Sequence, residues 1–254
     1  MSTEGAWPAA TGLITLQSCA STMQEARQRF AEFTGPTWLL SHRQTGGHGR
    51  RGRPWANPAG AFTATLAIPH PGTAEAAAQR SFIAALALFD AVAEVTGRPE
   101  ALSLKWPNDV LLNGGKLAGI LLESLNPRPN GQLDGLLIGL GVNLIQPPEG
   151  SEVEARAVRP VALAAETGIT VTPEDFLSHL APAFAAHEQR FATHGFGPIR
   201  SAWLARAAKL GQTITARMPR EEITGTFRSI NEMGYLQLDT PKGLVGIAAA
   251  EVFF

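Results

Sequence analysis

Cysteine is almost absent from this sequence of 254 residues, because Cys19 is its only representative. A single cysteine excludes an intramolecular disulfide and any zinc site built from several thiolates. The same scarcity fits a reducing compartment, where thiols stay reduced. We therefore expect Cys19 to be a small core residue rather than a functional thiol.

The sequence also lacks an excess of charge and a hydrophobic run long enough to span a membrane. Its 21 basic and 22 acidic residues give a net charge of -1, so no global field attracts nucleic acid or an anionic membrane. The longest apolar stretches, 82–95 and 136–145, fall short of the ~20 residues that cross a bilayer. The first residues have no signal-peptide pattern. These features predict a soluble, cytoplasmic protein in which any anion site is local.

Lysine is rare, since four of the 21 basic residues are lysines and the others are arginines. Two of the four, Lys105 and Lys116, lie in the short segment 105–123. Arginine is the usual source of positive charge in this chain, so the use of lysine here indicates a need for compact ammonium groups. The segment is the first candidate for a functional site.

Hydrophobic periodicity predicts a mixed α/β domain over most of the chain. We predict strands over 11–17, 37–41, 61–68, 102–104, 110–112, 116–124 and 133–145, and helices over 21–33, 74–96, 161–166, 173–192 and 199–208. A capping box formed by Ser21 with Gln24, or by Thr22 with Glu25, would start the first helix. Asn-Gly-Gly at 113–115 predicts a hairpin turn with positive φ. The segment 146–159, rich in proline and glutamate, predicts a surface excursion.

Beyond residue 210 the pattern changes to short β segments separated by turns. We predict strands over 213–218, 222–230, 235–239 and 244–248, which together suggest a small β-barrel. Two domains are therefore expected, 1–208 and 209–254. The fold class is α/β (α+β), with a mixed sheet in the larger domain.

The loop after the second predicted strand combines glycines and arginines. Residues 44–55 contain four glycines, His48, and the three arginines Arg50, Arg51 and Arg53. Glycines let backbone N–H groups approach an anion, and arginines offer bidentate contacts to phosphate or carboxylate. The loop has neither the P-loop nor the dinucleotide-binding pattern. It predicts a phosphate-bearing ligand, with a solvated loop or an RNA-contacting patch as alternatives.

Five motifs taken together resemble the biotin-protein ligase family. They are Ser21-Thr22, the loop 47–53, Lys-Trp-Pro-Asn-Asp at 105–109, Lys-Leu-Ala-Gly-Ile-Leu at 116–121, and Gly-Leu-Gly-Val-Asn at 139–143. They occur in the family's order, and the terminal segment resembles its small SH3-like C-terminal domain. The resemblance is to the short form without an N-terminal DNA-binding domain, because about ten residues precede the first predicted strand.

This resemblance implies a two-step reaction. Biotin and ATP with Mg²⁺ give biotinyl-5'-AMP and pyrophosphate, and a lysine of a biotin carboxyl carrier protein then takes the biotin. Lys116 matches the family's catalytic lysine, which contacts the carboxylate and the α-phosphate and would stabilise charge in the transition state. Arg50 matches the arginine that helps to retain the adenylate.

The resemblance also assigns the remaining site residues. The biotin side would consist of Ser21, Thr22, Gln44, Gly47, Gly119, Leu121 and Gly139. The nucleotide side would consist of His48, Arg51, Arg53, Trp55, Lys105, Asn108 and Asn143, with Trp55 stacking on or shielding the adenine as the loop closes. Asp109 would hold the metal. His48 stands where an arginine is usual, so we expect weaker retention of the adenylate.

Other interpretations remain open at this point. A lipoate or octanoate ligase on the same type of core is the nearest alternative, and a biotin-responsive regulator is a more distant one. Glu123 and Asp134 are expected to be solvated or structural. The implied partner is a carrier domain, with no DNA or membrane, and the protein would be a monomer or homodimer. Strict strand alternation would put Lys116 and Gly119 on opposite faces, so we expect a bulge, a backbone contact at Gly119, or a lysine that precedes the pleat.

Overall fold

A computed structural model describes residues 6–148 and 158–254. Seven strands form the main sheet, in the order β1-β2-β3-β7-β6-β5-β4. The sheet is mixed, because β1 and β2 are parallel whereas the other neighbours are antiparallel. Its strands are β1 (Gly12–Leu16), β2 (Thr37–Ser41), β3 (Phe62–Pro69), β4 (Leu102–Lys105), β5 (Asp109–Leu112), β6 (Gly115–Pro127) and β7 (Leu133–Val142).

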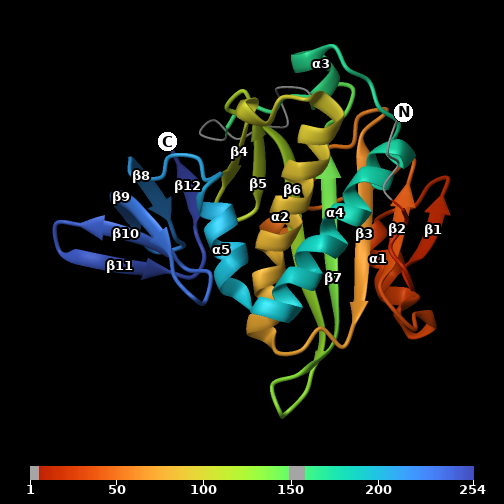
Figure 1. Ribbon diagram of the computed structural model, residues 1–254, viewed down its shortest axis with the longest axis horizontal. Coiled ribbons are helices and arrows are strands. Elements are labelled where there is room, and N and C mark those ends of the chain that lie inside the picture. The colour runs from red at the N-terminus through yellow and green to blue at the C-terminus, as the bar shows by residue number, and fades with distance from the viewer. Residues whose placement is uncertain (1–5, 149–157) are drawn as a thin grey trace.

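Helices cover both faces of this sheet. Helices α2 (Ala74–Thr96) and α4 (Pro173–His194) lie across one face, with α5 (Phe196–Leu204) beside them (Figure 1). On β3, Phe62 and Leu66 point into the main core under these helices. Ala67 points the other way, into a smaller core with Met23 of α1 (Thr22–Gln28). This alternation is what a strand between two helical layers requires. A short helix, α3 (Leu163–Thr167), follows β7 and precedes α4 in the sequence.

Helix α2 is the one helix in the described part of the chain that is long and apolar enough to cross a membrane. Its most apolar window is 72% buried inside the structure. Helix α2 has extensive contacts with α4 and with the sheet, so its composition is that of a core helix.

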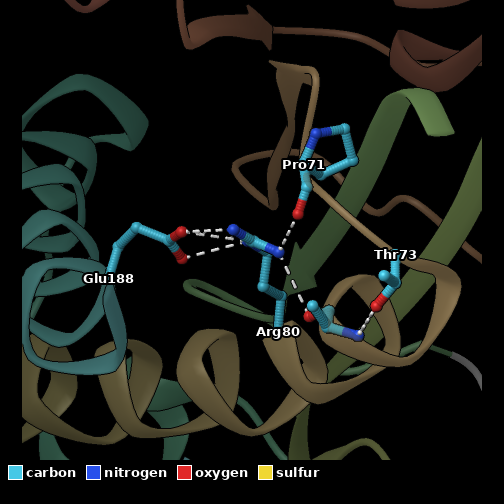
Figure 2. A network of polar contacts seen from close by, with 5 residues as sticks. Pro71, Thr73, Arg80 and Glu188 are labelled. Atoms are coloured by element: carbon cyan, nitrogen blue, oxygen red, sulfur yellow. Dashed lines mark hydrogen bonds and ion pairs between the residues drawn. The ribbon is translucent and has the colours of Figure 1, made fainter. Parts of the chain in front are cut away.

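A buried ionic network holds α2 against α4. The Arg80 side chain, 9% exposed, donates to both carboxylate oxygens of Glu188 over distances between 2.6 and 3.1 Å. It also donates to the backbone oxygens of Pro71 and Ala76, and Thr73 accepts from the Ala76 N–H (Figure 2). A fully paired guanidinium avoids the cost of a buried unpaired charge. The network therefore fixes how the two helices pack.

A second, antiparallel sheet has the order β11-β10-β9-β8-β12 and lies beside α5 (Figure 1). Trp106 Nε1 donates to the Gly234 oxygen at 3.1 Å, and Gln79 Nε2 donates to the Glu232 oxygen at 2.9 Å. A side chain at Gly234, which has φ 84°, would lie 2.9 Å from Phe82. Glycine is therefore needed where the turn before β10 packs against α2. The strands are β8 (Thr213–Arg217), β9 (Glu222–Ile230), β10 (Leu236–Thr240), β11 (Gly243–Ile247) and β12 (Glu251–Phe253).

The predicted elements are largely confirmed, with three corrections. The first helix ends at Gln28 instead of near residue 33, and a separate 3₁₀ turn, η1 (Phe30–Glu32), follows. The helix predicted over 199–208 begins at Phe196 and ends at Leu204. Strand β12 has no counterpart among the predicted strands. Most of the excursion predicted at 146–159 lies outside the described residues.

The capping box predicted at the start of α1 is not formed. Ser21 is the N-cap residue, but its side chain makes no capping hydrogen bond. The Thr22 hydroxyl donates to Gln44 instead of pairing with Glu25. Neither side chain therefore caps the helix.

Candidate active site

A cavity of about 610 Å³ opens where the main sheet, the loop after β2 and strand β12 meet. It collects most of the side chains that the sequence points to. Gly47 instead lines a shallow depression of the same loop, and Arg51 is directed to Glu251. The predicted residues that line the cavity are Ser21, Thr22, Gln44, His48, Arg50, Arg53, Trp55, Lys105, Asn108, Asp109, Lys116, Gly119, Leu121, Gly139 and Asn143.

A bulge in β6 decides which way Lys116 points. The register of β5 against β6 shifts between Lys116 and Ala118, which leaves Leu117 as an extra residue. Leu117 and Ala118 therefore both pack in the core, whereas Lys116 and Gly119 both line the cavity. Bulges redirect side chains in this way. The bulge, one of the three expected solutions to the alternation problem, is confirmed.

Two lysines flank one buried carboxylate in the cavity. Lys116 Nζ lies 2.7 Å from Asp109 Oδ1, and Lys105 Nζ lies 3.5 Å from Oδ2. Burial acts to raise the pKa of Asp109, but the charges of Lys116 and Lys105 outweigh it, so this pKa lies below its ordinary value. Burial lowers the pKa of Lys105, and the charge of Asp109 offsets only part of this shift. With both lysines protonated, the cluster has a net charge of one positive unit and suits an anionic ligand.

Glycines make the cavity floor flat, and Trp55 lies on it. Gly119 of β6 pairs with Gly141 of β7. A Cβ atom would lie 3.0 Å from the Trp55 indole at Gly119 and 2.5 Å from it at Gly141. The indole nitrogen is buried and has no hydrogen-bond partner among the described residues. The ring centroid is 5.5 Å from Lys116 Nζ, so Trp55 occupies the floor next to the lysine.

The inner end of the cavity is polar. Gln44 Oε1 accepts hydrogen bonds from the Thr22 N–H at 2.9 Å and from the Thr22 hydroxyl at 3.2 Å. Ser21 and Thr22 are both buried. Met23 closes this end by packing directly over Gly139. A Cβ atom at Gly139 would lie only 2.6 Å from the Met23 sulfur. Fixed polar groups beside apolar walls are typical of a site that orients a small ligand.

The arginine loop contacts the second sheet through Glu251. The loop turns back on itself, with a bridge between His48 and Pro54 and a short 3₁₀ turn, η2 (Arg50–Gly52). Arg51 lies 3.4 Å from the Glu251 carboxylate, and Arg53 pairs with the same carboxylate. The loop is therefore tied to β12.

Glu251 is a cavity residue that sequence reasoning missed. It also pairs with Arg217 at 2.7 Å. Burial acts to raise the pKa of Glu251, but the hydrogen bond from Arg217 and the charges of Arg53 and Arg51 outweigh it, so this pKa lies below its ordinary value. The carboxylate stays ionised and neutralises guanidinium groups near the cavity. No motif signals this role, because Glu251 is about 200 residues away from the loop in the sequence.

A second anchor joins the loop to β6. His48 Nε2 lies 3.3 Å from Glu123, which also accepts from Arg27 at 2.7 Å. Glu123 was expected to be solvated or structural, and the structural role agrees with this contact. Partly exposed pairs of this kind contribute at most ~1 kcal/mol, so the anchor is weak.

Both asparagines of the predicted site join backbone segments. Asn108 Nδ2 donates to the Ile120 oxygen at 2.7 Å, and Asn143 Nδ2 donates to the Val161 oxygen at 3.0 Å. Each therefore holds a turn or loop against the sheet while also lining the cavity.

Asp109 fits a metal that arrives with its ligand better than a resident one. Over the part of the chain that the structure describes, no group of three His, Cys, Asp or Glu side chains could hold a metal ion. Mg²⁺, however, needs only one or two carboxylates when substrate phosphates supply the other oxygens. Because lysines flank both oxygens of Asp109, Mg²⁺ would have to displace an ammonium group.

Comparison with known proteins agrees with this site. Residues 13–143 match the biotin/lipoate A/B protein ligase family, and residues 209–254 match the biotin protein ligase C-terminal domain. The biotin–[acetyl-CoA-carboxylase] ligase of Paracoccus denitrificans is 50% identical to this chain, over 92% of this chain and 97% of its own. The bifunctional ligase/repressor BirA of Bacillus subtilis is 28% identical, over 91% of this chain but 71% of its own length.

A solved structure supports the same family assignment. The biotin protein ligase of Aquifex aeolicus in complex with biotin and ATP superposes with a TM-score of 0.80 and 25% identity, covering 95% of this chain and 97% of that one. This likeness confirms the predicted fold class. Because the family match, the overall identity and the fold all agree, the chain belongs to the biotin/lipoate A/B protein ligase family.

Proposed function

We propose that this chain is an ATP-dependent biotin-protein ligase, which activates biotin as biotinyl-5'-AMP and transfers it to a lysine of a biotin carboxyl carrier protein. The observation that carries the proposal is the cluster of Lys116, Asp109 and Lys105, set in a cavity that the arginine loop also lines. Its volume of about 610 Å³ lies within the usual range for small-molecule sites.

In the first step, a biotin carboxylate oxygen attacks the α-phosphorus of ATP, and the bond from phosphorus to the pyrophosphate leaving group breaks. Both reacting groups are anions, so positive charge must lie between them. Lys116 supplies it by exchanging its contact with Asp109 for contacts with the carboxylate and the α-phosphate. Asp109 would provide one carboxylate oxygen for a Mg²⁺ ion bound to the phosphates of ATP, which would neutralise part of their charge.

The cavity has a polar end and a charged end, which we assign to the two substrates. Biotin lies with its ureido ring near Ser21, Thr22 and Gln44 and its tail along the glycine floor. ATP lies toward Arg50, Arg53 and Lys105, with Asn108 near the phosphates and Asn143 near the adenine.

Trp55 covers Gly119 and Gly141 in the structure, so it must leave the floor before a ligand lies there. This displacement agrees with an indole that stacks on or shields the adenine when the loop closes.

In the second step, the ε-amine of the carrier lysine attacks the acyl carbon of the adenylate, and AMP leaves. We assign the chemistry to a domain over 1–208 and closure of the phosphate side to a domain over 209–254, whose strand β12 supplies cavity residues. The protein would act in the cytoplasm, without DNA or membrane, as a monomer or homodimer.

The proposal is tested by pyrophosphate release with biotin, lipoate or octanoate, each with Mg-ATP. Biotin is expected to be the only good substrate, because its ureido ring alone matches the polar inner end. Turnover with lipoate or octanoate in its place would favour the alternative activity of the family, and no turnover with any of the three would contradict the proposal.

The His48→Arg variant is expected to release the adenylate more slowly, by a factor of about 2 to 5. A permanent guanidinium would strengthen the contact with Glu123 that holds the loop. The measurement is the dissociation rate of preformed biotinyl-5'-AMP. In a Glu123→Gln background the same substitution should have little effect, and an unchanged or faster rate in the single variant would count against this anchor.

A further inference from the structure

The hydroxyl of Thr65 is buried and does not line the cavity, but it contacts a residue of the polar inner end. Thr65 of β3 is 0% exposed. Its neighbours Ala64 and Leu66 point into the main core, so strand alternation directs Thr65 to the face on which α1 packs. There its hydroxyl donates to the Thr22 hydroxyl oxygen at 2.8 Å.

The contact between these two threonines gives the hydrogen bonds a fixed direction. A hydroxyl has one proton and two acceptor positions. Because Thr65 donates to Thr22, the Thr22 oxygen uses one acceptor position there, and its own proton goes to Gln44 Oε1 at 3.2 Å. Toward the cavity, Thr22 therefore has only an acceptor position left.

Gln44 is fixed with the opposite polarity. Its Oε1 accepts from both the N–H and the hydroxyl of Thr22, so its acceptor capacity is used. Its amide nitrogen lies against Gly47, where a Cβ atom would be only 2.2 Å from Nε2. Gly47 is thus needed for this side chain to lie where it does. Gln44 also lines the cavity, so a hydrogen bond from its side chain to a ligand there would use an N–H donor.

We infer that Thr65 is a positioning residue for biotin: by donating to Thr22, it makes the inner end of the cavity complementary to one edge of a cyclic urea. Such an edge carries an N–H donor next to a carbonyl acceptor. The Thr22 oxygen would accept from the N–H, and Gln44 would donate to the carbonyl. The inference rests on the proposed function and deepens it.

The same polarity explains selection against other acyl substrates. The dithiolane ring of lipoate and the end of an octanoate chain carry no adjacent donor and acceptor. A site with fixed polar groups rejects a ligand that leaves those groups unpaired. Loss of the Thr65 hydroxyl should therefore weaken the binding of biotin. It should not affect the binding of lipoate or octanoate, which is already poor.

The test compares Thr65→Val with Thr65→Ser by calorimetric titration of biotin and by steady-state kinetics. Valine keeps the shape but removes the donor, so the Kd and KM for biotin are expected to rise about 3- to 10-fold. The kcat value and the KM for ATP should stay unchanged. Serine keeps the hydroxyl and should keep biotin affinity near that of the wild type.

Thr96→Val is the matched control, because Thr96 is also buried and donates to the Val92 oxygen at 2.7 Å in α2, away from the cavity lining. Biotin Kd within twofold of the wild type in Thr65→Val, or an equal loss in Thr96→Val, would overturn the inference. If Thr65→Val does not fold, Thr65→Cys, with a weaker donor of similar size, makes the same comparison. Failure of the wild type to bind biotin would instead contradict the proposed function.

Discussion

Replacing Lys116 with alanine is expected to slow biotinyl-5'-AMP formation by about 10²- to 10³-fold, the usual cost of losing one charged or hydrogen-bonding group that stabilises a transition state. Asp109 keeps Lys105 at 3.5 Å, so its buried carboxylate is not left without a partner. The free energy of unfolding should therefore change little. Pyrophosphate release measures the rate, and thermal unfolding checks the fold.

Two further variants sharpen this prediction. Lys242→Ala removes an exposed lysine from the turn between β10 and β11 and should leave the rate unchanged. Lys116→Arg keeps the charge but places a larger, planar group against Gly119 and Trp55, so its rate should stay low. Near-normal turnover of Lys116→Ala would remove this lysine from its assigned role.

Replacing Glu251 with glutamine is expected to raise the KM for ATP about fivefold, because the neutral amide cannot hold the arginine loop. Three guanidinium groups, from Arg51, Arg53 and Arg217, contact this carboxylate. Arg51 and Arg53 belong to the loop, and at roughly 0.5 kcal/mol for each of these two partly exposed pairs, their loss amounts to about 1 kcal/mol. The loop arginines would then point to solvent instead of toward the phosphates. Steady-state kinetics at varied ATP concentration measures the effect.

The matched control for Glu251 lies in the same sheet. Asp239→Asn disrupts an exposed pair with Arg228 at 2.9 Å, outside the cavity lining, and should leave the KM for ATP unchanged. A lower KM for ATP in Glu251→Gln would mean that the carboxylate competes with phosphate for the arginines. In that case Glu251 opposes ATP binding and our interpretation of the contact is wrong.

Local patterns in the sequence predicted most of the fold. The apolar positions of 74–96 repeat with a helical period, and α2 has these bounds. The turn at 113–115 was predicted from residues that tolerate positive φ, and Asn113 and Gly114 have φ of 50° and 76°. A bulge in β6 was one of three expected solutions, because the family resemblance assigns Lys116 and Gly119 to one site and strict alternation could not put them on one face. The helix and the turn depend on neighbouring residues alone.

Other features depended on partners that local patterns do not contain. The capping box was predicted from spacing, yet Thr22 bonds to Gln44, because tertiary packing offers a buried side chain a better-placed acceptor. No pattern in the sequence indicated the role of Glu251 or the hydroxyl contact of Thr65. The side chains of threonine and glutamate can pair with many kinds of neighbour. Their function here therefore follows from where the fold places them.

By itself, the sequence determined the order of the elements, the hairpin, and the set of motifs that relate the chain to biotin-protein ligases, because periodicity, turn chemistry and motif order lie along the chain. Only the tertiary structure decided that Asp109 lies between two lysines, that Trp55 rests on the glycine floor, and that β12 holds the arginine loop. These contacts join residues far apart in sequence, and their geometry depends on how both sheets pack in three dimensions.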